Sequence, residues 1–194
     1  DNIVFMGMGE PLLNLPAVRK AVSILTDARG RALSARRITV STSGIVRGIY
    51  DLAEHGPHVR LAVSLTSADE ALRSELMPVS RDNPLPELRK AVARYAEQTG
   101  RRVTLEAALL GGRNTGEDAA EKMAEFACGL DVHINVIQLN PVDGLTFSEP
   151  SPAEIRSFMR ALERRGLNVS LRTRRGRKIG GACGQLGKTL VPAK

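Results

Sequence analysis

The sequence predicts an α/β fold with a mostly parallel sheet, and two patterns support that prediction. Short runs rich in β-branched residues recur along the whole chain, and amphipathic helical segments separate them. This alternation is typical of βα units, in which helices join parallel strands. The predicted strands are Ile3–Met6, Ile38–Thr42, Val59–Leu65, Val103–Leu109, His133–Leu139 and Val169–Leu171. Six strands are too few for a closed eight-stranded barrel, which leaves a doubly wound sheet or an open, partial barrel.

Three helical segments carry clear signals. The first has an apolar stripe within residues 18–25 and begins near Pro16, and the second has its stripe within residues 88–95 and ends at Gly100. The last has an apolar stripe within residues 155–162 and a complete set of end signals. These are Ser151 as N-cap, Pro152 at the first helical position, Glu154 as capping-box acid and Gly166 at the end.

The charge of the chain is unevenly distributed. Its 194 residues include 28 Lys and Arg and 21 Asp and Glu, which gives a net charge of +7. Nine of the cations lie from Arg164 onward, where there is no Asp or Glu, so the first 163 residues carry a net −2. We therefore predict a sheet domain over residues 1–173 and a basic tail over residues 174–194, which allows a polyanionic partner.

Composition excludes several classes of protein. Two cysteines cannot form a disulfide framework and fit a reducing, cytoplasmic compartment. No apolar run approaches the roughly 18 residues of a membrane span, and the first residues lack a signal-peptide pattern. Aromatic residues make up 3% of the chain, so base-stacking platforms are scarce. We expect a monomer without membrane contact, and a strand at the first residues suggests a piece truncated at its amino terminus.

Polar residues and glycines directly follow four of the predicted strands, where a parallel sheet has its working loops. The segments are residues 7–11, 41–44, 64–66 and Asn140-Pro141. Each alone could be an ordinary turn. Glu10 is more informative, because a carboxylate beside Gly7 and Gly9 suits a cationic ammonium ligand.

Two nucleotide-binding fingerprints come close and fail. Gly7 and Gly9 begin a dinucleotide motif, but Leu12 stands where its third glycine belongs. Residues 187–189 imitate the end of a P-loop, whose first glycine is replaced by Ala182. The histidines also show no metal-ligand spacing, so we expect surface or supporting positions for His55, His58 and His133.

The two cysteines have different surroundings. Cys128 ends a helical stretch over residues 121–128, where a small buried thiol is expected. Cys183 lies between glycines beyond the last regular element, and upstream cations favour its thiolate. It is either a nucleophile suited to covalent chemistry on a nucleic acid or an ordinary tail thiol.

Together these residues resemble the RlmN/Cfr family of radical S-adenosylmethionine RNA methyltransferases. The resemblance rests on residues 7–14, 37–44, 61–65, Asn140-Pro141 and the Ala-Cys-Gly-Gln-Leu string at 182–186. Residues 174–176, Arg-Arg-Gly, are more similar to the RlmN branch than to the Cfr branch.

The resemblance implies a partial (βα)6 barrel with a 4Fe-4S cluster that methylates carbon 2 of an adenine in 23S rRNA, and in some members also tRNA. It implies that Gly9 and Glu10 contact the methionine amino group of S-adenosylmethionine. The residues implied to line the rest of that cofactor are Ser41, Ser64, Leu65, Thr66 and Asn140.

The implied catalytic residue is Cys183, as the carrier of the methyl group. One S-adenosylmethionine methylates its sulfur, and a second is cleaved at the cluster to a deoxyadenosyl radical that removes a hydrogen from that methyl. The carbon radical then adds to the adenine and forms a covalent protein–RNA intermediate. Such chemistry belongs to the cofactor, and the tail cations would bind phosphates.

The chain departs from the family pattern at four positions. The resemblance implies His where Thr66 stands, Tyr at Ala107, Asp at Thr115 and Asp at Lys178. The sequence has no match for three parts of the family: the three-cysteine cluster motif, the resolving cysteine and the accessory RNA-binding domain. We therefore expect the 194 residues to be inactive alone. Two alternatives stay open: Cfr-like methylation at carbon 8, and a non-catalytic RNA-binding module that uses only its basic tail.

Overall fold

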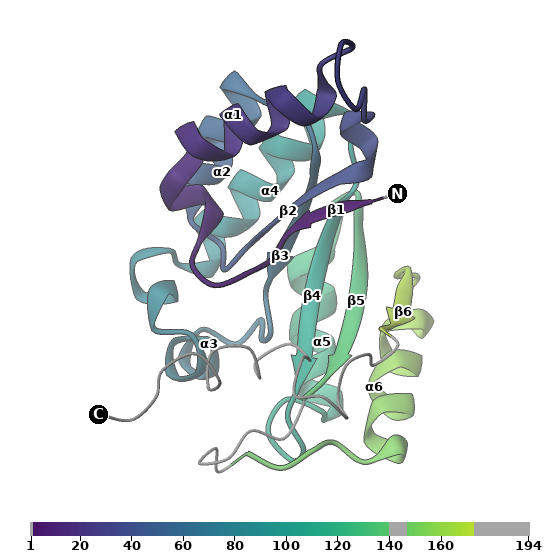
Figure 1. Cartoon of the computed structure of the whole chain (residues 1–194). Helices are drawn as coiled ribbons and strands as arrows, with labels where there is room; N and C mark the ends of the chain where they lie inside the picture. Colours follow the sequence, from purple (N-terminus) through teal and green to yellow (C-terminus); the bar gives the residue numbers. More distant parts are fainter. Residues whose placement is uncertain (1, 140–146, 173–194) are drawn as a thin grey trace, which may run out of the picture.

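The computed structural model describes residues 2–139 and 147–172, which form a six-stranded sheet in the order β1-β2-β3-β4-β5-β6. Every neighbouring pair of strands is parallel (Figure 1). The strands are β1 (Ile3–Phe5), β2 (Ile38–Thr42), β3 (Arg60–Ser64), β4 (Val103–Leu109), β5 (Val132–Gln138) and β6 (Val169–Leu171).

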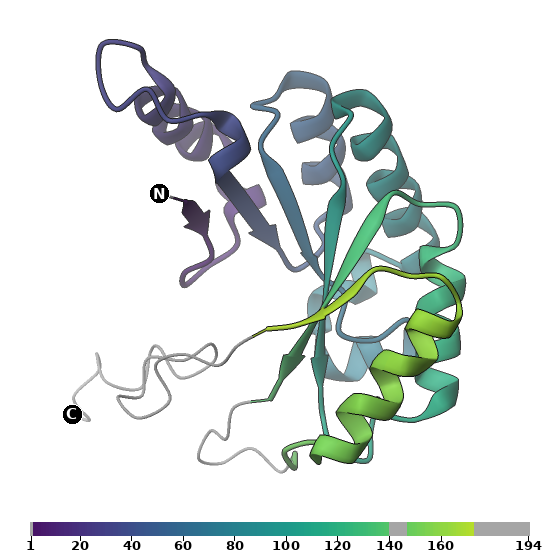
Figure 2. The same ribbon diagram turned by 90° about the vertical axis from the view of Figure 1, so that its right-hand side faces the viewer.

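This strand order decides between the two architectures that the sequence allows. A doubly wound sheet reverses its strand order at a switch point, whereas these strands follow one another in chain order. The sheet curls in Figure 2 without closing. The predicted partial (βα)6 barrel is therefore confirmed.

Helices connect the strands and lie along the outer side of the curved sheet. They are α1 (Leu15–Thr26), α2 (Val46–His55), α3 (Glu70–Leu76), α4 (Leu85–Thr99), α5 (Glu117–Ala127) and α6 (Pro152–Arg164), with short 3-10 helices η1 (Pro11–Asn14), η2 (Ala35–Arg37) and η3 (Pro78–Asp82). The predicted capping box of α6 is present, since the Ser151 side chain accepts from Glu154 N and the Glu154 side chain accepts from Ser151 N. Among the described helices, none is both long and apolar enough to cross a membrane.

The two sides of the sheet differ in chemistry. Strand residues that face the helices are apolar and fully buried, such as Val40, Val63 and Leu105, and each contributes about 1.5–3 kcal/mol by burial. Successive strand residues point to opposite sides, so the inner, concave side carries polar residues such as Ser41 and Glu106. No described helix covers that side (Figure 2).

One sequence expectation is wrong. Cys128 is exposed rather than buried, because α5 ends at Ala127 and the backbone N–H of Cys128 closes the helix by donating to Glu125 O. Gly129, at φ +72°, then turns the chain toward β5.

Candidate functional site

Glu10 joins the loops that follow β1 and β2. Its Oε1 accepts from the backbone N–H of Leu12 at 3.0 Å, which caps η1. Its Oε2 accepts from both the backbone N–H and the hydroxyl of Ser43, at 2.8 and 2.7 Å. A carboxylate offers about four lone-pair positions, so these three bonds fix its place and leave capacity for one further donor.

Arg73, on α3, joins the loop after β2 to the loop after β3. It is fully buried, and its guanidinium donates to Ser64 O at 2.9 Å, Leu65 O at 2.5 Å and Ser43 O at 2.8 Å. Burial lowers the pKa of Arg73 to about 10, with the charge of Glu70 acting in the opposite direction. The side chain therefore stays cationic at neutral pH and holds both loops by charge-assisted hydrogen bonds.

Gly44 allows this approach of Arg73. Its φ is +102°, and a Cβ at this position would lie 2.9 Å from the Arg73 guanidinium. A side chain would therefore be strained by the backbone and would clash with Arg73.

Thr66 stands at the end of β3 in a strained conformation, with a φ of +60°. The backbone N–H groups of Leu65 and Thr66 both donate to Glu106 O at 3.0 Å, which ends the regular ladder. Asn114 donates through Nδ2 to Thr66 O at 2.9 Å and to Ala108 O at 2.8 Å, and its Oδ1 accepts from Leu110 N at 2.7 Å. The buried Asn114 therefore fixes the loops after β3 and β4 together.

A polar row crosses the concave side of the sheet. Ser64, Glu106, Asn135 and Ser170 are partners in the register of β3 to β6. Burial raises the pKa of Glu106, while the charge of Arg172 and hydrogen bonds from Asn135 and Ser41 act to lower it. The row therefore places a nearly buried carboxyl group at the centre of the concave side.

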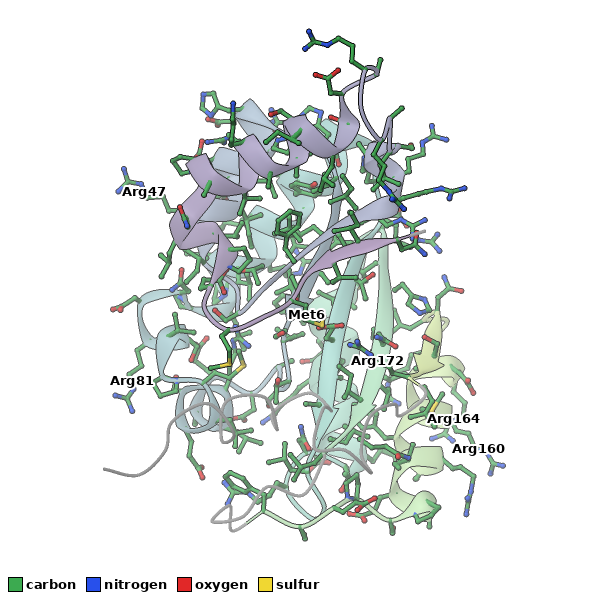
Figure 3. All side chains as sticks on the ribbon, viewed as in Figure 1. Met6, Arg47, Arg81, Arg160, Arg164 and Arg172 are labelled. Carbon is green, nitrogen blue, oxygen red and sulfur yellow. The ribbon has the colours of Figure 1, made fainter. Side chains whose placement is uncertain are left out.

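Arg172, directly after β6, connects this row to Met6, the residue after β1. Its Nη1 lies 3.3 Å from Glu106 Oε1, and its Nη2 lies 3.7 Å from Met6 Sδ. Figure 3 shows Met6 and Arg172 on the same side of the ribbon. The two ends of the sheet thus meet through one guanidinium.

The predicted site residues fall into three groups. Glu10 is linked to the β2 loop, whose Ser43 was not a predicted site residue. Ser41 and Ser64 lie on neighbouring strands of the concave side, whereas the side chain of Leu65 is fully buried in the core. Asn140 and Cys183 lie outside the described residues, as do Lys178 and the predicted domain boundary at residues 173 and 174.

The histidines lie where the sequence predicts, at surface or supporting positions. His55 is exposed and pairs with Asp51, and His58 contacts a backbone carbonyl. His133 lies on the concave side, 2.7 Å from Ser170 Oγ. The described residues contain no group of three or more His, Cys, Asp or Glu that could hold a metal ion.

No protein-family model matches the chain, but individual relatives do. A probable dual-specificity RNA methyltransferase RlmN of Treponema denticola is 58% identical over 97% of this chain and 54% of its own length. The protein of the same name from Treponema pallidum (strain Nichols) is 52% identical over 97% of this chain and 56% of its own. The chain spans about half the length of the curated relatives that it matches.

Solved structures agree. A radical SAM methyltransferase from Sphaerobacter thermophilus is 46% identical with a TM-score of 0.92, covering 95% of this chain and 54% of that one. Over its matched residues, the chain is therefore similar to proteins named RlmN, which confirms the resemblance to the RlmN/Cfr family. A domain of pyruvate-formate lyase-activating enzyme from Bacteroides vulgatus is 19% identical with a TM-score of 0.64, covering 89% of this chain and 99% of that domain, and shows the fold alone.

Three of the four departures from the RlmN/Cfr pattern lie among the described residues. Thr66 occupies a left-handed conformation that histidine adopts more readily than a β-branched residue. Ala107 is buried in the core. Thr115 donates to Glu154 Oε1 at 2.7 Å, and this bond is the largest cause that lowers the pKa of Glu154 to about 2.

Sequence reasoning missed Arg73 as a residue of the site and noted Asn114 only as the neighbour of Thr115. A cation in a helical segment usually indicates a surface residue, so nothing local marks Arg73. Asn114 stands in a glycine-rich loop after β4, and a short amide in such a loop was the available signal.

Proposed function

We propose that this chain supplies the cofactor-binding barrel of an enzyme that methylates carbon 2 of an adenine in 23S rRNA, and in tRNA as well. The main support is identity of up to 58% over 97% of the chain with proteins named as RNA methyltransferases. The structural match to a radical SAM methyltransferase points to the same chemistry. We expect the protein to act as a monomer in the cytoplasm.

The loops that follow the carboxyl ends of β1 to β4, here called the carboxyl edge of the sheet, suit S-adenosylmethionine. Glu10 keeps one acceptor position beside Gly7 and Gly9, where an added Cβ would meet no atom within 4 Å. We propose that Glu10 accepts from the ammonium group of the ligand, that Gly9 leaves room for it, and that Asn140 and the segments around Ser41 and residues 64–66 line the remainder. Since the Leu65 side chain is buried, its contribution is positional. When bound, this cofactor supplies the methyl group and the radical that removes a hydrogen.

A 4Fe-4S cluster does not fit the described residues. The sequence has two cysteines, and Cys128 is exposed at the end of α5. We therefore propose that these 194 residues are inactive without cluster ligands from elsewhere.

We propose that the sulfur of Cys183 accepts the methyl group and carries it to the adenine. Cys128 provides a matched control, because it is the other cysteine of the chain and closes an outer helix. The intact protein, reconstituted anaerobically with iron and sulfide, should methylate RNA as wild type and as Cys128→Ala. Cys183→Ala should lose methylation to background.

Liquid chromatography with mass spectrometry of the digested RNA, against 2-methyladenosine and 8-methyladenosine standards, would measure both the amount and the ring position of the product. Normal methylation by Cys183→Ala would contradict the carrier role. A product methylated at carbon 8 would show that the reaction is the Cfr-like one and that the proposal of carbon 2 is wrong. RNA binding without iron uptake or methylation would favour the non-catalytic module.

A further inference from the structure

A basic pocket of about 480 Å³ lies at the amino ends of strands β2 to β5. This edge of the sheet is opposite the one that carries Glu10 and Thr66. Among the described residues, the lining of the pocket consists of Arg36, Arg60, Arg101, Arg102 and His133 together with small and hydroxyl residues, and includes no acidic side chain. The fold thus gathers four guanidinium groups at a place that the proposed cofactor site does not use.

The topology brings these arginines together. Arg36 lies in η2 just before β2, Arg60 begins β3, and Arg101 and Arg102 join α4 to β4. Parallel strands in neighbouring positions start at the same edge, so residues far apart in sequence become neighbours. The negative end of the α4 dipole accounts for cations that follow α4. It does not account for Arg36 and Arg60, which belong to other elements.

Most of this positive charge is uncompensated within the part of the chain that the structure describes. Arg102 pairs with Asp131 at 2.7 Å, and both side chains are more than half exposed. Arg36 and Arg60 are exposed and make no ion pair there. The Nε of Arg101 is buried and has no hydrogen-bond partner, which costs about 1–3 kcal/mol. An anion among these groups would supply the missing acceptors.

The pKa of His133 is affected by the same positive charge. Burial is the main cause that lowers its pKa, and the charge of Arg102 is the second. A neutral His133 still offers hydrogen bonds to a ligand, while the arginines supply the charge.

We propose that this pocket binds phosphate groups of the RNA backbone, at a part of the substrate remote from the reacting base. Guanidinium groups match phosphate oxygens in geometry and charge, and four from separate elements fit a chain of phosphates better than a single small anion. The seven residues of β4 span roughly 20–25 Å between the two edges. The pocket would therefore contact nucleotides distant from the target adenine and position the RNA without reading its sequence.

This inference rests on the proposed function, and the test separates the two. Binding of a 23S rRNA hairpin and of tRNA to the intact protein is measured by fluorescence anisotropy over a series of salt concentrations. We expect the double variant Arg60→Gln/Arg101→Gln to bind about tenfold more weakly, with a salt slope lower by roughly 1 to 2, since each phosphate contact contributes about 0.7 to 0.9. The RNA KM in the methylation assay should rise while kcat is unchanged.

The matched control is Arg47→Gln/Arg160→Gln, which removes two exposed arginines from α2 and α6 (Figure 3). If this control and the pocket variant have the same affinity and salt slope, the pocket proposal is wrong. Circular dichroism checks folding, and Arg36→Gln/Arg60→Gln, which changes only exposed side chains, replaces the first variant if that one is unfolded. If the pocket variant binds RNA more weakly but the intact wild-type protein does not methylate RNA, the proposed function is wrong and the pocket proposal stands. If the wild-type protein methylates RNA and the pocket variant has an unchanged KM for RNA, the pocket proposal is wrong and the proposed function stands.

Discussion

The two edges of the sheet are built in opposite ways. At the carboxyl edge, Arg73, Asn114 and Glu10 each hold backbone groups of loops that are distant in sequence, although the Nε of Arg73 is buried without a hydrogen-bond partner. At the amino edge, Arg36, Arg60 and Arg101 meet in a pocket without carboxylate partners among the described residues.

The difference separates two tasks. A site that must fix a small cofactor benefits from loops whose positions are set before binding, because less ordering is needed on binding. A surface that contacts a nucleic-acid backbone needs positive charge more than fixed geometry, because phosphate contacts act over a distance and depend on salt. The carboxyl edge fits the first task and the amino edge fits the second.

Removing Arg73 should break the carboxyl edge. Arg73→Met leaves the carbonyls of Ser43, Ser64 and Leu65 without their buried donor, and each unsatisfied group costs about 1–3 kcal/mol. We expect the free energy of unfolding to fall by about 3–5 kcal/mol in urea titrations. Arg81→Met, which removes an exposed arginine from η3 (Figure 3), is the control and should change little. A loss below about 1 kcal/mol for Arg73→Met would show that water replaces the guanidinium.

The fold was predictable because its signals are local and periodic. The strands were placed within about one residue, and the capping box of α6 was read from Ser151 and Glu154. Glu10 was identified from its neighbouring glycines, but its partner Ser43 lies 33 residues away. Arg73 and Asn114 act on backbone groups that no side-chain pattern announces, so only the folded chain shows their role.

Charge counting was misleading for the same reason. The first 163 residues sum to −2, which located the basicity in the C-terminal stretch. The arginines of the amino-edge pocket are spread from residue 36 to residue 102 among acidic residues, and they meet only because parallel strands begin at a common edge. A net charge over sequence does not show how charge is arranged on a surface.

Thr66 gives a second test of the carboxyl edge, because its backbone is strained there. Its φ of +60° disfavours a β-branched residue, whereas asparagine adopts this conformation readily. Thr66→Asn should therefore raise the free energy of unfolding by about 0.5–1 kcal/mol. Thr66→Val keeps the β-branch and should show no gain in the same urea titrations. A loss of stability in Thr66→Asn would mean that the threonine side chain makes a compensating contact.

Glu106 lies between the two edges and gives the smallest effect, in the pH dependence of stability. Burial raises the pKa of Glu106 above the ordinary value of a glutamate, in opposition to the charge of Arg172. A carboxyl group with a raised pKa in the folded state stabilises the fold below the unfolded pKa, and this contribution is lost as pH rises through the folded pKa. Glu106→Gln stays neutral, so its stability relative to wild type should increase as the pH rises above the ordinary pKa of a glutamate.

Urea unfolding of both proteins across this range measures the trend, and the exposed Glu97→Gln on α4 provides the baseline for removing one carboxylate. The opposite trend would mean that the attraction of Arg172, 3.3 Å away, exceeds the cost of burying the Glu106 charge. In that case the centre of the concave side would be held by a paired charge, as the carboxyl edge is held by Arg73. The open amino edge would then differ from the rest of the concave side as well as from the opposite edge.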